Sequence, residues 1–156
     1  MNPNNNIKLA SIEDFKRLKE IGMNCYEHTV PKDQQSFLTR FLFWRYFSKR
    51  KFKERQRLDV LIYCLEVNGT IMGFYELEQT GCLSSLYVHQ DGLKKGYGKA
   101  LLLHSLKEAK RIGLKEVYLD ASQFAHDFYK HFGFKDTKKP KVLMGVWMVP
   151  MKIKVD

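Results

Sequence analysis

Long apolar runs are missing from this sequence. The chain of 156 residues is 44% hydrophobic and 28% charged, which is ordinary for a globular domain. Its uncharged apolar stretches are far shorter than the roughly 20 residues of a membrane-spanning helix. No basic start followed by an apolar stretch marks a secretion signal. We therefore expect one cytoplasmic domain over residues 1–156, with the polar residues 1–6 disordered and no membrane partner.

Cysteine is scarce as well. Cys25, Cys64 and Cys82 are widely spaced, and no CxxC pair or His/Cys cluster has the spacing of metal ligands. We expect no metal. Buried free thiols in a reducing compartment are a simpler interpretation than a catalytic cysteine.

Acidic residues are few relative to basic ones. Seventeen Asp and Glu oppose 27 Lys and Arg, which gives a formal net charge of +10. Such a field attracts nucleic acid, an anionic membrane or a phosphate-rich small molecule. Six of the basic residues lie in 48–57, "SKRKFKERQR", and the simplest interpretation of this run is the solvated end of a helix and the loop after it.

The first half of the chain has a helical pattern after a short strand. Residues 6–10 alternate as a strand does, and Ser11 with Asp14 resembles a capping box that starts an amphipathic helix. Pro31 interrupts the pattern, and Asp33 is positioned to cap a second helix running through "QQSFLTRFLFWRYFSKRK". That helix is apolar nearly all round, so it is either deeply buried or presents one face to a ligand or partner. Its aromatic residues are Phe37, Phe41, Phe43, Trp44, Tyr46 and Phe47.

The second half begins with β-rich segments. Asn68-Gly69 is a strong hairpin signal, and with Thr80-Gly81 it predicts an antiparallel meander of strands. A helix ending at Gly113 should follow. The expected ranges are strands 59–67, 70–78 and 82–88, a helix over 98–112, a strand over 115–121, a short helix capped by Ser122 and ended by Gly133, a further strand from about 134, and a last strand over 141–153. The chain is thus predicted to be α+β with a mostly antiparallel sheet.

Glycines cluster between a predicted strand and a predicted helix in "HQDGLKKGYGKALLLHSL", residues 89–106. The unpaired amides and partial positive charge of a helix N-terminus favour an anion, and Gly96 and Gly98 would let a phosphate approach the backbone. The P-loop pattern is absent, and the dinucleotide pattern lacks its third glycine. Taken alone, the cluster is also compatible with a plain turn.

The segments "LYVHQDGLKKGYGKALL" (86–102) and "LDASQFAHDFYKHFGF" (119–134) together resemble two linked motifs of the acetyl-CoA-dependent N-acetyltransferase superfamily known as GNAT. The first resembles its acyl-CoA-binding motif, and the second resembles its later strand and short helix. The resemblance covers about residues 58–135 and implies a mixed, mostly antiparallel sheet flanked by about four helices in α/β/α layers. One departure is Leu93, which stands where the family motif has Gln or Arg.

The resemblance implies that acetyl-CoA binds as a co-substrate. The pantetheine arm would add to strand 82–88 along the backbone of Leu86, Tyr87 and Val88, where an N–H near Tyr87 or Val88 would serve as an oxyanion donor. The pyrophosphate would rest on the loop that follows. The loop residues assigned to the cofactor are Leu93, Lys94, Lys95, Gly96, Tyr97, Gly98 and Lys99, joined by Phe128 from the later motif.

The acceptor is then expected to be a primary amine of a small molecule or peptide, which attacks directly in a ternary complex. Only roughly one part in two thousand of such an amine is neutral at pH 7, so a base or water chain must remove a proton. Glu76 and Glu78, two apart on the strand predicted over 70–78, are the candidates, with His89 a third; an ordinary exposed strand face is the alternative for the two carboxylates. The resemblance assigns Tyr129 as the acid that protonates the leaving thiolate, with core packing as its alternative.

No motif identifies the amine. In this fold the first two helices wall the acceptor site, so the resemblance implies lining roles for Phe37, Phe41, Trp44 and Tyr46, with core packing as the alternative, and Glu27 and His28 would lie in the loop between the helices. The positive charge disfavours a polycationic acceptor.

Three further interpretations stay open. The chain is either an enzyme or an acyl-CoA sensor without turnover, and residues 48–57 with Phe52 would allow nucleic-acid binding, although we do not expect it. Exposed strand edges and the aromatic helix also suggest a homodimer.

Overall fold

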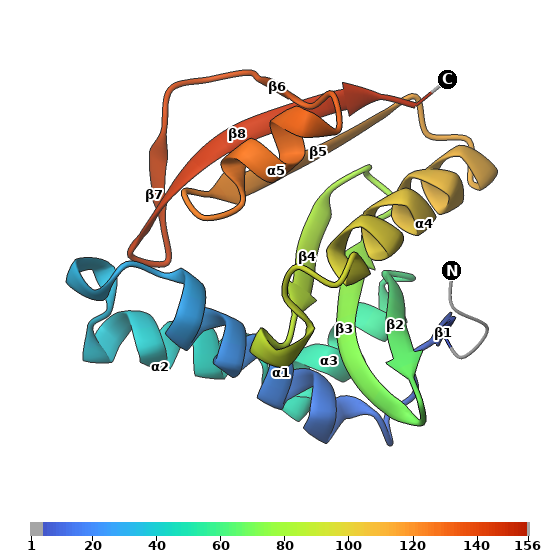
Figure 1. The fold of residues 1–156 in the computed structure, drawn as a ribbon, viewed down its shortest axis with the longest axis horizontal. Helices are drawn as coiled ribbons and strands as arrows, with labels where there is room; N and C mark the ends of the chain where they lie inside the picture. The colour runs from blue at the N-terminus through green and yellow to red at the C-terminus, as the bar shows by residue number, and fades with distance from the viewer. Residues whose placement is uncertain (1–4, 156) are drawn as a thin grey trace.

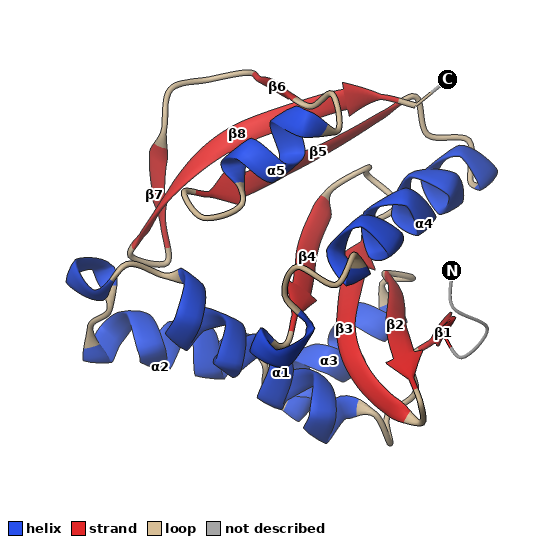
Figure 2. Cartoon of the chain, viewed as in Figure 1, coloured by secondary structure: helices blue, strands red, loops and turns tan. Residues whose placement is uncertain are grey.

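Two antiparallel sheets that diverge from one another frame the molecule (Figures 1 and 2). The computed structural model describes residues 5–155. The first sheet has the strand order β1-β2-β3-β4, and the second has the order β5-β8-β6 with β7 also paired to β8. The α+β class and the mostly antiparallel pairing predicted from the sequence are confirmed.

The helices and strands follow one another in mixed order along the chain. Their bounds are β1 (Asn5–Leu9), α1 (Phe15–Thr29), the 3₁₀ turn η1 (Lys32–Gln34), α2 (Phe37–Tyr46), α3 (Lys49–Arg57), β2 (Leu61–Val67), β3 (Thr70–Leu77), β4 (Leu83–Val88), the 3₁₀ turn η2 (Gln90–Gly92), α4 (Tyr97–Arg111), β5 (Glu116–Ser122), α5 (His126–His131), β6 (Lys135–Asp136), β7 (Lys141–Leu143) and β8 (Val146–Lys154). The predicted disorder of residues 1–6 is wrong for Asn5 and Asn6, which pair with β2. Residues 1–4 lie outside the described residues.

The predicted meander forms the centre of the first sheet. Strands β2, β3 and β4 pair in antiparallel order, and Asn68 and Gly69 both have a positive φ at the turn between β2 and β3. Gly81, with a φ of 91°, serves the next turn. A two-residue turn with both φ values positive matches the twist of the strands that it joins, which is why this signal was readable in the sequence.

The long aromatic helix predicted after Pro31 is two helices. Helix α2 ends at Tyr46. The hydroxyl of Ser48 accepts a hydrogen bond from the Lys51 amide and so caps the start of α3. The cap of α2 is Ser36, whose hydroxyl accepts from the Thr39 amide, whereas the predicted cap Asp33 lies in η1. Each serine satisfies an amide that its helix cannot pair.

The predicted last strand is likewise divided in two. Met144 and Gly145 both have a positive φ, so β7 folds back on β8 as a tight hairpin. Pro150 lies in β8 opposite Asp120 of β5, between the segment that pairs with β7 and the segment that pairs with β6. The carbonyl oxygen of Pro150 accepts from the Thr137 amide, so the strand continues through the proline.

Helices cover both faces of the first sheet. Leu101 and Leu102 of α4 are fully buried against one face, and Ile21 of α1 is fully buried on the other with Phe74. Gly73 of β3 permits close approach of β4 and α4, because an added Cβ would fall 2.7 Å from the Tyr87 carbonyl oxygen and 2.9 Å from Leu101 Cδ1. Within residues 5–155, no helix has the length and apolar character needed to cross a bilayer.

Candidate functional site

One backbone bridge joins the two sheets among the described residues, and beyond it they separate. A parallel bridge joins Cys82 to Tyr118, whose amide donates to the Gly81 carbonyl oxygen at 3.0 Å, and from there β4 and β5 diverge (Figure 1). The opening holds a cavity of about 560 Å³, within the range of ligand sites. Its walls come from β4, the loop before α4 with the first turn of that helix, β5, the segment before α5, α5 itself, β8, and the C-terminal parts of α1 and α2.

The loop before α4 forms one end of the cavity. Gly96, with a φ of 81°, occupies the N-cap position of α4, and Lys94 also has a positive φ, of 59°. This conformation leaves the first amides of α4 without helical partners, as an anion site requires. The predicted cofactor residues in this loop line the cavity except Lys95, which is exposed. Leu93 packs against the hydrophobic core, which accounts for an apolar residue at this position.

The free edge of β4 faces the opening. The His89 amide donates to the Met72 carbonyl oxygen of β3. Along an antiparallel strand, residues whose backbone groups bond the partner strand alternate with residues whose backbone groups point away from it. The backbone groups of Leu86 and Val88 therefore point toward the gap between the sheets, whereas those of Tyr87 point toward β3. All three of these residues line the cavity.

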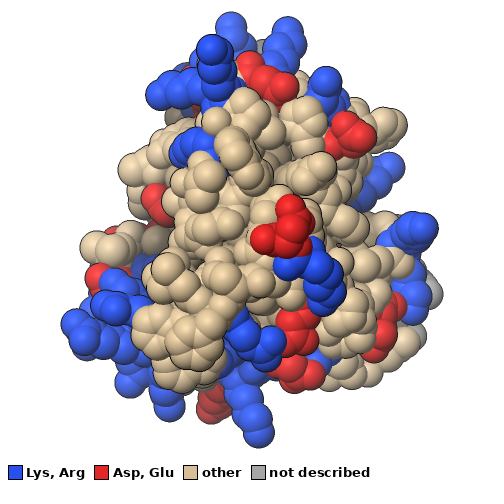
Figure 3. Space-filling model, turned by 90° about the vertical axis from the view of Figure 1, so that its left-hand side faces the viewer, with Lys and Arg blue, Asp and Glu red and all other residues tan. Residues whose placement is uncertain are grey.

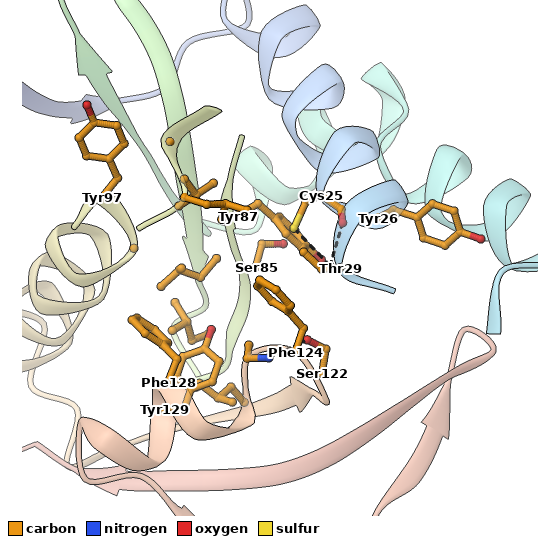
Figure 4. A pocket seen from close by; sticks show the side chains of 18 of the residues that line it. Cys25, Tyr26, Thr29, Ser85, Tyr87, Tyr97, Ser122, Phe124, Phe128 and Tyr129 are labelled. Atoms are coloured by element: carbon orange, nitrogen blue, oxygen red, sulfur yellow. Dashed lines mark hydrogen bonds between the residues drawn. The ribbon is translucent and has the colours of Figure 1, made fainter. Parts of the chain in front are cut away.

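Helix α5 contributes Phe128 and Tyr129 to the lower wall in Figure 4. The Tyr129 side chain is buried, and its ring packs edge-to-face on Phe128 and Phe134. Burial raises the pKa of the Tyr129 hydroxyl, so the group is protonated at neutral pH. Tyr129 thus lies both in the cavity wall and in the hydrophobic core, and its role as the acid stays a prediction.

Sequence reasoning missed Cys25, which lines the cavity at the end of α1 (Figure 4). Its thiol lies 3.7 Å from the Thr29 hydroxyl. Burial raises the pKa of Cys25 to about 11, and hydrogen bonds to Thr29 and to the Val88 backbone act in the opposite direction. A lone cysteine in a helical pattern carries no signal in the sequence that it will face a site.

Glu76 is the most completely enclosed carboxylate of the first sheet. One of its oxygens accepts from the hydroxyls of Tyr46 at 2.9 Å and Ser85 at 3.1 Å, and the other accepts from Arg55 at 3.1 Å. Burial raises the pKa of Glu76, while Arg55, Tyr46 and Ser85 oppose that rise. Glu76 itself does not line the cavity, but Ser85 does. The exposed strand face considered for Glu76 is therefore wrong.

The other candidate bases lie outside the cavity walls. Glu78 follows the last residue of β3 and accepts from the Thr80 hydroxyl. His89 caps η2 through a contact with the Asp91 amide. Glu27 and His28, expected in a loop, belong to the last turn of α1, where Glu27 pairs with Arg40. Among residues 5–155, no group of three or more His, Cys, Asp and Glu is arranged to hold a metal ion.

The aromatic residues of the second predicted helix divide between inside and outside. Phe43 lines the main cavity, and the Tyr46 hydroxyl donates a hydrogen bond to Glu76. The exposed side chains of Phe37, Phe41 and Trp44 instead border a separate shallow cavity. Phe37, Phe41 and Trp44, which were expected to line the acceptor site, therefore do not line the main cavity. In α3, Phe52 is 1% exposed, so it offers no ring for base stacking.

Sequence comparison decides the family. Residues 31–155 match the family model described as "Acetyltransferase (GNAT) domain". The chain belongs to the GNAT acetyltransferase family. It is an acyltransferase that uses acetyl-CoA, and the family predicted from the two motifs is confirmed. No curated protein sequence matches the chain.

Solved GNAT structures agree with this fold over nearly the whole chain. The PaiA N-acetyltransferase of Thermoplasma acidophilum, solved with coenzyme A, is 26% identical, with a TM-score of 0.84 over 96% of this chain and 98% of that one. A GCN5-related N-acetyltransferase of Rhodopseudomonas palustris has 22% identity and a TM-score of 0.82 over 96% and 94%. YncA of Salmonella typhimurium, a putative acetyltransferase solved with acetyl-CoA, has 23% identity and a TM-score of 0.70 over 98% and 95%.

Proposed function

We propose that this enzyme transfers the acetyl group of acetyl-CoA to a primary amine by direct attack in a ternary complex. The observation that carries the proposal is one continuous cavity, which extends from the glycine loop past Tyr129 to the ends of α1 and α2. One end suits a phosphate group and the other is free for an acceptor. Both substrates would therefore be bound together, without a covalent enzyme intermediate.

The loop and the β4 edge fit the cofactor. A Cβ at Gly96 would meet nothing within 4 Å, while a Cβ at Gly98 would face the Phe128 ring at 3.7 Å, across the space next to the free amides. The Ser84 hydroxyl is buried in the cavity wall without a partner among the described residues. We assign the pyrophosphate to the amides of residues 93–99 and the pantetheine to the outward backbone groups of Leu86 and Val88.

When bound, acetyl-CoA supplies an activated thioester carbonyl. The outward N–H of Val88 would donate to the negative charge that develops on the carbonyl oxygen. In the free enzyme this N–H faces the Cys25 thiol, so the thioester oxygen would replace the sulfur as its partner, while strand pairing holds the amide in position. Of the two amides suggested by the sequence, Val88 is the one that strand alternation turns toward the cavity.

Proton removal is assigned to Glu76 acting through Ser85. The Ser85 hydroxyl lines the cavity and donates to Glu76, so it can accept a proton from the amine while its own proton moves to the carboxylate. Desolvation raises the pKa of Glu76 and makes it a better proton acceptor than a solvated carboxylate. We propose no base role for Glu78, which lies outside the cavity walls.

Tyr129 is assigned to the leaving group. Its hydroxyl, protonated because burial raises its pKa, would donate to the sulfur as the thioester breaks. A buried tyrosinate is more basic than a thiolate. The environment therefore favours a hydrogen bond to the departing sulfur in the transition state over formation of free tyrosinate.

The test combines binding and turnover. Thermal unfolding is followed with acetyl-CoA and with an equimolar oligonucleotide, and thiol release is then measured over a panel of amines, with acetylated product identified by mass spectrometry. Stabilisation by acetyl-CoA together with thiol release supports the proposal. Stabilisation without release from any amine would leave a sensor in its place, and stabilisation by the oligonucleotide alone would favour nucleic-acid binding.

A further inference from the structure

The half of the cavity away from the glycine loop is apolar. Its side chains come from four separate elements, which leave between them a space bounded mainly by rings and methyl groups. They include Val30, Phe43, Phe124 and Met148, with Cys25 and Thr29 beside them. In Figure 4, Phe124 lies below Ser85, the residue that we assign to the proton route from the acceptor amine. An acceptor with an apolar body fits such walls.

Charge is nearly absent from the same walls. Among the described residues that line the cavity, only Lys94, Lys99 and Asp120 carry a formal charge. The two lysines belong to the loop assigned to the pyrophosphate. Asp120 is therefore the one carboxylate in the described walls able to attract a second ammonium group of an acceptor.

Asp120 is neutralised by Lys141. The Asp120 carboxylate lies 2.9 Å from the Lys141 ammonium, with side-chain exposures of 27% and 50%. The strand register explains the contact: Lys141 of β7 pairs with Met148, which in turn pairs with Ser122 of β5, two residues from Asp120. All these side chains lie on the same face of the second sheet, so Lys141 reaches diagonally across β8 at Pro150.

We infer that the acceptor is a monoamine with an apolar or aromatic body, and that Lys141 sets this preference by neutralising Asp120. The inference rests on the proposed function. A polyamine or a basic peptide would bring a second cation into a half-cavity with no free carboxylate among the described residues, and would lose hydration without a compensating partner. An anionic body would find no Arg or Lys in that half of the described walls.

The experiment compares matched amines with the intact enzyme. Pentylamine and 1,5-diaminopentane differ by one terminal ammonium, and phenethylamine and ethanolamine test the body of the acceptor. We expect kcat/KM for pentylamine to exceed that for the diamine by roughly tenfold or more, and phenethylamine to exceed ethanolamine similarly. Equal use of pentylamine and the diamine, or a preference for the diamine, would overturn the inference while leaving the proposed function in place.

Variants test the assignment of Lys141. Lys141→Met keeps the length of the side chain and frees Asp120, so it should raise kcat/KM for the diamine relative to pentylamine by about tenfold, with the affinity for acetyl-CoA unchanged. Lys141→Arg should retain the original preference, and the double variant Lys141→Met with Asp120→Asn should lose the gain. If Lys141→Met leaves the ratio of kcat/KM for the diamine to kcat/KM for pentylamine unchanged, Lys141 does not set the preference. If no amine releases thiol although acetyl-CoA binds, the proposed function fails, and that result is distinct from a changed preference.

Discussion

At the scale of single residues, the site is built from side chains whose environments differ sharply. Tyr129 and Cys25 are enclosed on facing sides of one cavity, and burial raises the pKa of each. Glu76 is buried behind the wall, with Ser85 as its contact with the interior of the cavity. The chemistry we propose depends on these groups in three different positions, so single substitutions separate them.

Tyr129→Phe should lower kcat by roughly a hundredfold or more, because it removes the donor to the leaving sulfur and keeps the ring that packs on Phe134. Acetyl-CoA affinity should change little, since the hydroxyl acts only as the thioester breaks. Steady-state kinetics and calorimetric titration measure the two effects. Unchanged turnover would remove Tyr129 from the mechanism.

Ser85→Ala should lower kcat by roughly tenfold to a hundredfold, because the amine loses its route to Glu76. Ser85→Thr, which retains a hydroxyl, should restore most of the rate. The loss should shrink as the pH approaches the pKa of the amine, since more acceptor is then already neutral. A loss that is constant across pH, and not rescued by threonine, would indicate a packing defect instead of a proton route.

The thiol of Cys25 should react slowly with iodoacetamide. With its pKa raised to about 11, the folded protein holds the proton, and the alkylation rate should rise about tenfold per pH unit below that value. Cys82, with its pKa raised to about 12, should react more slowly still and serves as an internal control. Mass spectrometry of each cysteine gives the rates. Acetyl-CoA should protect Cys25, and fast reaction at pH 7 in its presence would contradict the placement of the thiol.

At the scale of helices and strands, the sequence carried most of the fold. The meander, α4 and the glycine loop follow from local signals such as Asn68-Gly69 and Gly113, which have positive φ in the structure. The division between α2 and α3 did not, because the aromatic pattern continues through Phe47 and only its burial against Gly22 reveals the turn. The β7–β8 hairpin was missed because Met144, a residue that seldom adopts positive φ, occupies its turn.

The same distinction applies to the site. The cofactor loop could be predicted because consecutive residues form it. The acceptor half could not, because Cys25, Phe43, Phe124 and Met148 are brought together only by tertiary packing. The sequence also could not reveal that Glu76 would be buried with Arg55, since the two are 21 residues apart and lie on different elements.

Helix α4 offers a prediction of its own. Gly98→Ala should leave the protein as stable as before or more stable by up to about 1 kcal/mol, because alanine favours helix and its Cβ would meet Phe128 at an ordinary 3.7 Å. Acetyl-CoA affinity should nevertheless fall by roughly tenfold, since the methyl group enters the space next to the free amides. Thermal unfolding and titration report the two quantities, with Leu103→Ala on the exposed face as a control. Equal affinity would argue against phosphate binding there.

At the scale of the whole molecule, charge and shape both favour an anionic co-substrate. The chain carries a formal net charge of +10, and Figure 3 shows Lys and Arg side chains gathered at the top, the lower left and the right edge of one face, with a group of acidic and basic side chains near its centre. The field concentrates polyanions near the protein, while the geometry of the loop selects one with a pyrophosphate.

Acetyl-CoA at a hundred times its Kd should raise the free energy of unfolding by about 2.7 kcal/mol, which corresponds to a shift in Tm of roughly 5 to 11 °C for a domain of this size. Raising the ionic strength from 50 to 500 mM should weaken the binding severalfold, because the lysines of the loop are partly screened. Scanning fluorimetry and titration at the two salt concentrations provide the measurement. Salt-independent affinity would mean that the lysines contribute little.

The single bridge between Cys82 and Tyr118 has a consequence for how such an enzyme can change. The loop residues 93–99 and the β4 edge belong to one half of the molecule, whereas Asp120, Phe124 and Met148 belong to the other. Substitutions at Asp120, Phe124 and Met148 can widen, narrow or recharge the acceptor space while the loop 93–99 stays unchanged, provided that Phe128 and Tyr129 of the same half are kept. The specificity for the acceptor can therefore change separately from the binding of coenzyme A, and a new acceptor can be acquired while the cofactor site is retained.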